Sequence, residues 1–167
     1  MSASEKSKSA SQAAGSVIVV NLRGLVNTRA SVRTTLEQLH ITKRFNSTIV
    51  PADESHLGML RSAKEHVAWT RADALTVEKL LRERSEVSDG NKFPESDLKK
   101  FGYSSFSDLA QKVASGSVVL DGTQGMRQFF RLNSPKGGFK RSIRRPFRAG
   151  GILGENPELG KIVEKMI

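Results

Sequence analysis

The first third of the chain alternates between compact apolar runs and apolar residues at helical spacing. The run VIVVNLR (17–23) predicts a buried strand, because β-branched residues favour an extended backbone. Val32, Leu36 and Leu39 then recur at the spacing of one helix face. The run RFNSTIV (44–50), closed by a proline, predicts a second strand.

A second helix and a third strand repeat this alternation. Leu57, Leu60 and Val67 fall on one helix face, and HVAWT (66–70) has the composition of a short strand. The pattern leaves open where this helix ends and the strand begins. The order β-α-β-α-β predicts an α+β fold, in which both helices cover one face of a small sheet and the other face stays available.

From Ala72 onward the sequence predicts a second section that is richer in helices. LTVEKLLRER (75–84) and SFSDLAQKVASG (105–116) both have helical periodicity. Ser105 and Asp108 form a typical N-terminal capping pair for the second of these helices.

Two short strands and a final helix are expected after these helices. VVL (118–120) and QFFRL (128–132) predict the strands, on either side of a glycine-containing turn. The last helix is expected over residues 157–166, with Asn156 as its cap and Pro157 at its first position.

Charge changes the interpretation of the stretch before that helix. The chain carries a net charge of +10 and has a pI near 10.2, which points to a polyanionic partner. Residues 53–109 are slightly acidic, whereas residues 122–154 contain eight basic residues and no acid. A solvated surface normally mixes both signs, so the second stretch is a candidate binding segment.

The segment SPKGGFKRSIRRPFRAGG (134–151) is expected to be a long exposed loop, because unpaired charges are expensive to bury. Its arginines suit bidentate binding of phosphate. Phe139 and Phe147 either stack on bases or anchor the loop to the core, and the sequence leaves both readings open. Glycine and proline here disfavour the amphipathic helix that membrane binding would require.

A second, weaker basic group lies in the first third of the chain, where a solvated surface is an equally good interpretation on charge alone. Its members are Arg23, Arg29, Arg33, Lys43 and Arg44.

Signals of catalysis, cofactors and membranes are missing. The three histidines lack metal-binding spacing, there is no cysteine, and neither a GxSxG elbow nor a phosphate loop ending in GK[ST] occurs. No apolar run approaches the length of a membrane span. Residues 1–16 are expected to be a flexible Ser/Ala-rich tail rather than a secretory signal. We therefore expect no enzyme, cofactor, metal, small-molecule substrate or membrane partner.

The sequence resembles a family of large-ribosomal-subunit proteins, numbered thirty in bacteria and seven in eukaryotes. The resemblance rests on residues 17–70 and on FFRLNSPKGGFKRSIRRPFRAGGILG, with RLNSPKGGFKR as its most specific part. It implies a ferredoxin-like β-α-β-α-β core over 17–71 and a C-terminal extension of helices over 72–167. The extension would contain a long basic loop at 127–151. The mild N-terminal tail favours the archaeal type of this family.

The resemblance also implies a structural role on the ribosome in the cytoplasm, with large-subunit rRNA and neighbouring ribosomal proteins as partners. A free-standing RNA-binding module or a ribosome assembly factor of the same fold is the alternative. A helix start at His56 would meet phosphate through its N–H groups. The expected RNA-binding residues are Arg23, Asn27, Arg29, Arg33, Lys43, Arg44, Asn46, His56, Arg131, Lys136, Lys140, Arg141, Arg144, Arg145 and Arg148.

Overall fold

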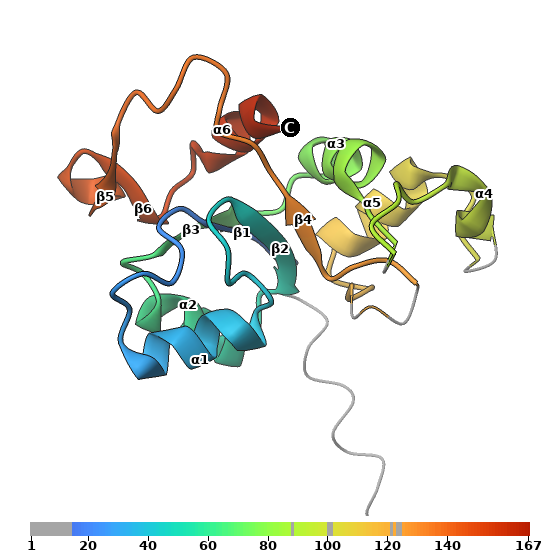
Figure 1. Ribbon diagram of the computed structural model, residues 1–167. Coiled ribbons are helices and arrows are strands. Elements are labelled where there is room, and N and C mark those ends of the chain that lie inside the picture. Colours follow the sequence, from blue (N-terminus) through green and yellow to red (C-terminus); the bar gives the residue numbers. More distant parts are fainter. Residues whose placement is uncertain (1–14, 88, 100–101, 121, 123–124) are drawn as a thin grey trace, which may run out of the picture.

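A six-stranded sheet runs through the molecule, with helices against both of its faces (Figure 1). The computed structural model describes residues 15–87, 89–99, 102–120, 122 and 125–167. The strand order is β4-β2-β1-β3-β6-β5. The strands are β1 (Ser16–Asn21), β2 (Asn46–Pro51), β3 (Val67–Arg71), β4 (Phe129–Arg131), β5 (Ser142–Pro146) and β6 (Gly151–Glu155). The helices are α1 (Ala30–Gln38), α2 (Glu54–Ser62), α3 (Ala74–Arg84), α4 (Glu95–Leu98), α5 (Phe106–Ala114), the 3-10 turn η2 (Phe147–Ala149) and α6 (Leu159–Met166).

The β-α-β-α-β order predicted for the first third of the chain is confirmed. β1 pairs antiparallel with β2 on one side and with β3 on the other. α2 ends at Ser62 and β3 begins at Val67, which settles the boundary that the sequence leaves open. Ser16, assigned to the tail from sequence, is the first residue of β1, and residues 1–14 lie outside the described residues.

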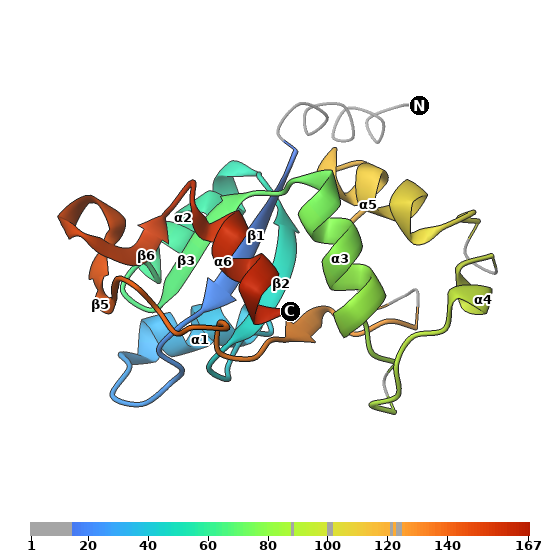
Figure 2. The ribbon, with the colours of Figure 1, turned by 90° about the horizontal axis from the view of Figure 1, so that it is seen from above.

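The far face of this sheet is not available, in contrast to the sequence expectation. Val17 and Val19 face α1 and α2, whereas Ile18 and Val20 face a larger apolar cluster on the opposite side. α3, α5 and α6 supply that cluster, and Figure 2 shows α6 lying over the sheet with α3 beside β2. The physical reason is present in the strand itself, because VIVV is apolar at successive positions and a sheet covered on one face needs only alternate ones.

Three elements of the second section, α3, α5 and β4, match their predictions, and the strand expected over 118–120 does not. The backbone N–H of Asp108 donates to Ser105 Oγ at 3.3 Å, so the capping of α5 is confirmed. Within 128–132, β4 forms and pairs with β2. Residues 118–120 form no strand, and Val119 is exposed.

The last helix starts later than the predicted residue 157. Asn156 organises the preceding turn, where its Oδ1 accepts from the backbone N–H of Glu158 at 2.8 Å. The helical span then begins at Leu159 and buries Leu159, Val163 and Met166 against the larger cluster.

The basic segment is less open than its sequence indicates. Residues 132–141 form a loop, but residues 142–155 form β5, η2 and β6, which extend the sheet beyond β3. The expectation of one continuous loop up to residue 151 is therefore wrong in extent. Gly151 permits this arrangement, because a Cβ at this position would overlap the carbonyl group of Arg145.

Candidate nucleic-acid interface

Four chain segments meet where β1 ends and where β2 and β3 begin. The backbone N–H of Phe45 donates to the carbonyl of Asn21 at 2.6 Å, and that of Leu22 donates to His66 at 3.0 Å. β4 ends at the same place, because Arg131 pairs with Asn46. We call this region the basic edge and define it by its exposed cations, which are Arg23, Arg29, Lys43, Arg44, Arg131, Lys136 and Lys140.

Asn21 organises the first loop of the basic edge. Its buried side chain accepts from the N–H groups of Arg23 and Gly24 at 3.1 and 2.8 Å, and donates to the carbonyl of Ile41 at 2.6 Å. It thereby ties the loop after β1 to the return from α1. The sequence analysis missed Asn21, although a polar residue inside the apolar run VIVVNLR is a signal of such a role.

His66 is the buried titratable group behind this loop. Its Nε2 lies 3.0 Å from Thr28 Oγ1, and Arg23 Nη1 donates to the carbonyl of Glu65 at 3.1 Å. Burial is the main cause that lowers the pKa of His66 below its ordinary value of 6.5, and the charge of Arg23 adds to it, while Glu65 opposes it. The imidazole is therefore neutral near pH 7, and the positive charge at this position comes from Arg23.

An aromatic contact joins the two basic stretches of the sequence. The rings of Phe45 and Phe139 lie 5.9 Å apart, and the Arg44 guanidinium lies 4.6 Å from the centre of the Phe45 ring. Phe139 also packs against the larger apolar cluster. Of the two readings left open for this ring, the structure supports the anchoring one, and the loop that carries Lys140 is held beside Arg44.

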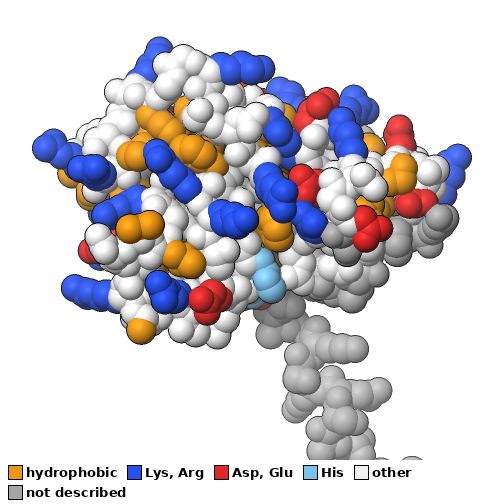
Figure 3. All heavy atoms as spheres, viewed as in Figure 1, with side chains coloured by type: hydrophobic (Ala, Val, Ile, Leu, Met, Phe, Trp, Pro, Cys, Tyr) orange, Lys and Arg blue, Asp and Glu red, His pale blue; other side chains and the backbone are white. Residues whose placement is uncertain are grey.

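The cations differ in how far acids already neutralise them. Glu86 lies 2.8 Å from Arg127 and 3.8 Å from Arg131, and Glu158 lies 3.4 Å from Arg141. Over the described ranges, the other expected cations form no ion pair, and they are Arg23, Arg29, Arg33, Lys43, Arg44, Lys136, Lys140, Arg144, Arg145 and Arg148. Figure 3 shows most of the acids of this view over the α3–α5 side of the molecule.

Three expected residues lie away from the basic edge or point inward. Asn46 is 6 % exposed within β2, so its side chain does not reach a partner in solvent. His56 stands in α2, which follows the opposite end of β2, and its Nδ1 lies 3.7 Å from Asp53. Arg33 is exposed on α1, whereas Asn27 is exposed in the loop of the basic edge with a φ of 54°.

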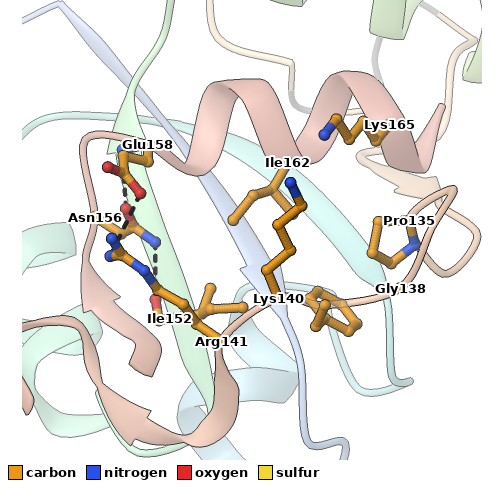
Figure 4. A pocket seen from close by; sticks show the side chains of 10 residues that line it. Pro135, Gly138, Lys140, Arg141, Ile152, Asn156, Glu158, Ile162 and Lys165 are labelled. Carbon is orange, nitrogen blue, oxygen red and sulfur yellow. Dashed lines mark hydrogen bonds and ion pairs between the residues drawn. The ribbon is translucent and has the colours of Figure 1, made fainter. Parts of the chain in front are cut away.

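A hollow of about 230 Å³ separates the 135–141 loop from α6 (Figure 4). Phe139, Ile152 and Ile162 make it partly apolar, and Lys140 and Lys165 lie at its rim. Arg141 is drawn toward Glu158 on its other side. Backbone hydrogen bonds tie the start of the loop to the end of α6, from the N–H of Asn133 to the carbonyl of Met166 and from the N–H of Lys136 to the carbonyl of Lys165, both at 3.0 Å.

Metal-binding and membrane-spanning features are absent from the described residues. No group of three or more His, Cys, Asp or Glu side chains that could hold a metal ion occurs there. Among the same residues, the helices are too short or too polar to cross a bilayer. The fold and the basic edge together are typical of an α+β protein of the nucleic-acid-binding class.

Comparison with known proteins gives the family. Residues 17–67 match the model of ribosomal protein L30p/L7e. The chain is 37% identical over 153 residues to the large ribosomal subunit protein uL30 of Ignicoccus hospitalis, covering 90% of this chain and 96% of that one. It is 34% identical over 154 residues to the protein of the same name from Nitrosopumilus maritimus, covering 92% and 99%. The chain belongs to the ribosomal protein L30p/L7e family.

Membership of this family confirms the ferredoxin-like core and the expectation of a structural ribosomal protein rather than an enzyme. The archaeal relatives match nearly the whole chain, which confirms the expectation of the longer, archaeal type. The sequence analysis missed two cations, Arg61 and Lys64, because they lie outside both basic stretches. Only the fold brings them next to β5, across a groove.

Proposed function

We propose that this chain is a structural constituent of the large ribosomal subunit that binds and stabilises rRNA. The observation that carries the proposal is the likeness to uL30 proteins over 90% of the chain, which includes the basic segment as well as the core. Neighbouring ribosomal proteins are its further partners, and its place is on the ribosome in the cytoplasm. An rRNA partner also accounts for cations that no acid of the described chain neutralises.

The basic edge and the β5–β6 strands form the proposed rRNA-binding surface. Its unpaired cations stand on loops and on an edge strand, where they reach phosphates without disturbing the core. Arg131 and Arg141 contribute less net charge, because Glu86 and Glu158 lie beside them. Asn46 and His56 are not part of this proposed surface, for the reasons of burial and position given above.

We treat residues 17–71 and 72–167 as one folded unit rather than as independent domains. The larger apolar cluster draws on both parts, from Ile18 and Val20 in β1 to Leu80 in α3 and Val163 in α6. The core that would bind rRNA therefore depends on the extension for its packing.

Sedimentation of ribosomal particles tests the proposal. A tagged copy of the chain, expressed in an archaeal host, should travel with large subunits and remain there at moderate salt. Release at moderate salt, or association with precursor particles alone, would instead favour the alternative of an assembly factor or free-standing RNA-binding module.

A competition experiment locates the binding surface within the same setting. Lys140, Arg141, Arg144, Arg145 and Arg148 are all exposed and are changed together to Ala. Surface changes of this kind usually alter stability by no more than about 0.5 kcal/mol each. The variant should therefore melt close to the parent but enter large subunits poorly. A control variant with Arg82 and Lys99 changed to Ala, two exposed cations on the acidic side, should compete as well as the parent.

A further inference from the structure

A groove of about 640 Å³ lies between α2 and β3 on one side and the β5–β6 strands on the other. Figure 1 shows β5 and β6 beside β3, with α2 on the face below. We call it the aromatic groove, because Trp69 and Phe147 line it. Its volume falls within the range of about 300–1,000 Å³ typical of ligand sites.

The cations of the groove come from three separate parts of the chain. Arg61 and Lys64 stand at the end of α2, Arg144 and Arg148 in and after β5, and Arg23 in the loop after β1. Within the described ranges none of these five forms an ion pair. Two acids, Glu65 and Glu155, also line the groove, but the five cations outnumber them and the net charge of the lining is positive.

The two aromatic rings are only partly covered by the protein. Trp69 packs against the smaller apolar cluster but is half-buried, and Phe147 is half-buried in the η2 turn. The Arg141 guanidinium lies 5.2 Å from the centre of the Phe147 ring and supports it. Half-exposed rings among unpaired arginines are the surface on which unstacked bases bind, with phosphates at the cations.

We propose that the aromatic groove takes unpaired nucleotides of the rRNA, with bases against Trp69 and Phe147 and phosphates at Arg61, Arg144 and Arg148. The proposal rests on the rRNA-binding function proposed above and adds that two surfaces of the protein bind different parts of the RNA. The basic edge meets RNA backbone by charge, whereas the groove requires bases that have left a helical stack. Duplex RNA cannot satisfy the rings, because its bases are stacked on one another.

Tryptophan fluorescence offers a direct test, because Trp69 is the only tryptophan of the chain. The purified full-length protein is titrated with a single-stranded decauridylate and, separately, with a ten-base-pair RNA duplex. The single strand should quench the emission of Trp69, and the duplex should bind through the basic edge with little quenching. A poly-glutamate peptide of equal charge should neither bind comparably nor quench.

Variants separate stacking from general attraction. Phe147→Ala should weaken decauridylate binding by about 5- to 150-fold, as expected for loss of one stacked base, and leave duplex binding unchanged. Tyr103→Ala removes a half-buried ring outside the groove and should leave both affinities as they are. If Phe147→Ala fails to fold, the exposed pair Arg61→Ala and Lys64→Ala is used, which should weaken single-strand binding more than duplex binding.

Several outcomes overturn the inference. These are decauridylate binding without a change in Trp69 emission, an equal loss of single-strand and duplex affinity in Phe147→Ala, and comparable quenching by poly-glutamate. Binding to rRNA extracted from archaeal large subunits is measured alongside. If that binding persists while the groove tests fail, only the inference about the groove is wrong. If the protein binds no rRNA at all, the proposed function fails with it.

Discussion

A single hydrogen atom at position 151 determines whether β5 can lie where it does. The backbone of Arg145 passes so close to Gly151 that any Cβ would collide with its carbonyl group. Backbone cannot move aside as a flexible side chain can, so the strands would have to separate. Gly151→Ala should therefore lower the free energy of unfolding by about 1–3 kcal/mol, the usual cost of forced overpacking. Thermal or denaturant unfolding followed by circular dichroism measures it.

Gly58 provides the matched control for that change. It lies within α2, and a Cβ there would have no neighbour within 4 Å. Gly58→Ala should leave stability unchanged or raise it by about 0.5–1 kcal/mol, because alanine restricts the unfolded chain and favours the helix. Equal behaviour of the two variants would show that β5 does not press on Gly151 in solution.

His66 makes stability depend on pH. Its pKa in the folded protein is lowered by burial and by Arg23, so below about pH 6.5 the unfolded chain binds the proton more readily than the folded one. The contribution of His66 to the free energy of unfolding is therefore fully present above pH 6.5, and it is lost as the pH falls through the lowered pKa of the folded state. His66→Gln should melt with a weaker dependence on pH between 7.5 and 5, measured by thermal unfolding at each pH.

At the scale of elements, the extension (residues 72–167) supplies helices that cover one face of the β1–β2–β3 sheet. A fragment of residues 15–72 would expose Ile18, Val20 and Ile49, which are at most 3 % exposed in the whole chain. We expect this fragment to bind a hydrophobic dye and to lack a cooperative unfolding transition, because it cannot bury one face of its sheet. Calorimetry and dye fluorescence measure both. A monomeric fragment with a sharp transition would contradict the view of one folded unit.

Local patterns predicted those elements that depend on local interactions. β1, β2, β3 and the capped helix α5 follow from β-branched runs and from the Ser105–Asp108 pair. β5 and β6 were not predictable in the same way, because their stability comes from pairing with each other and with distant β3. Glycine, proline and arginine in that stretch are typical of loops, and only the tertiary partner overrides this preference.

The candidate site was predictable to the extent that it consists of charge. The two basic stretches could be read directly from the sequence, and the loops that carry them do meet at one edge. Arg61, Lys64 and Trp69 could not, because they are unremarkable on their own helix and strand. The groove that brings these three residues together forms only when β6 pairs with β3. Asn46, expected at the site from the family resemblance, is buried in β2, and nothing in its sequence position indicates that burial.

The whole molecule carries a net charge of +10, so its affinity for RNA should depend steeply on salt concentration. If about six to eight phosphates are contacted, affinity for rRNA should fall by about a thousandfold or more between 50 and 200 mM salt, with the slope of duplex DNA as guide. Filter binding or fluorescence anisotropy at several salt concentrations measures the slope. A nearly flat dependence would mean that apolar or protein contacts recruit the chain.

Both outer strands of the sheet come from the last 39 residues of the chain, since β4 covers β2 and β6 with β5 extends beyond β3. During synthesis, β1, β2 and β3 therefore leave the exit tunnel long before their flanking strands exist. For that interval the nascent chain presents two unpaired strand edges and an uncovered apolar face, which are features that promote aggregation. A protein built in this way should require a chaperone or its RNA partner soon after translation, and a chain that lacks β4, β5 and β6 should keep these unpaired edges and aggregate.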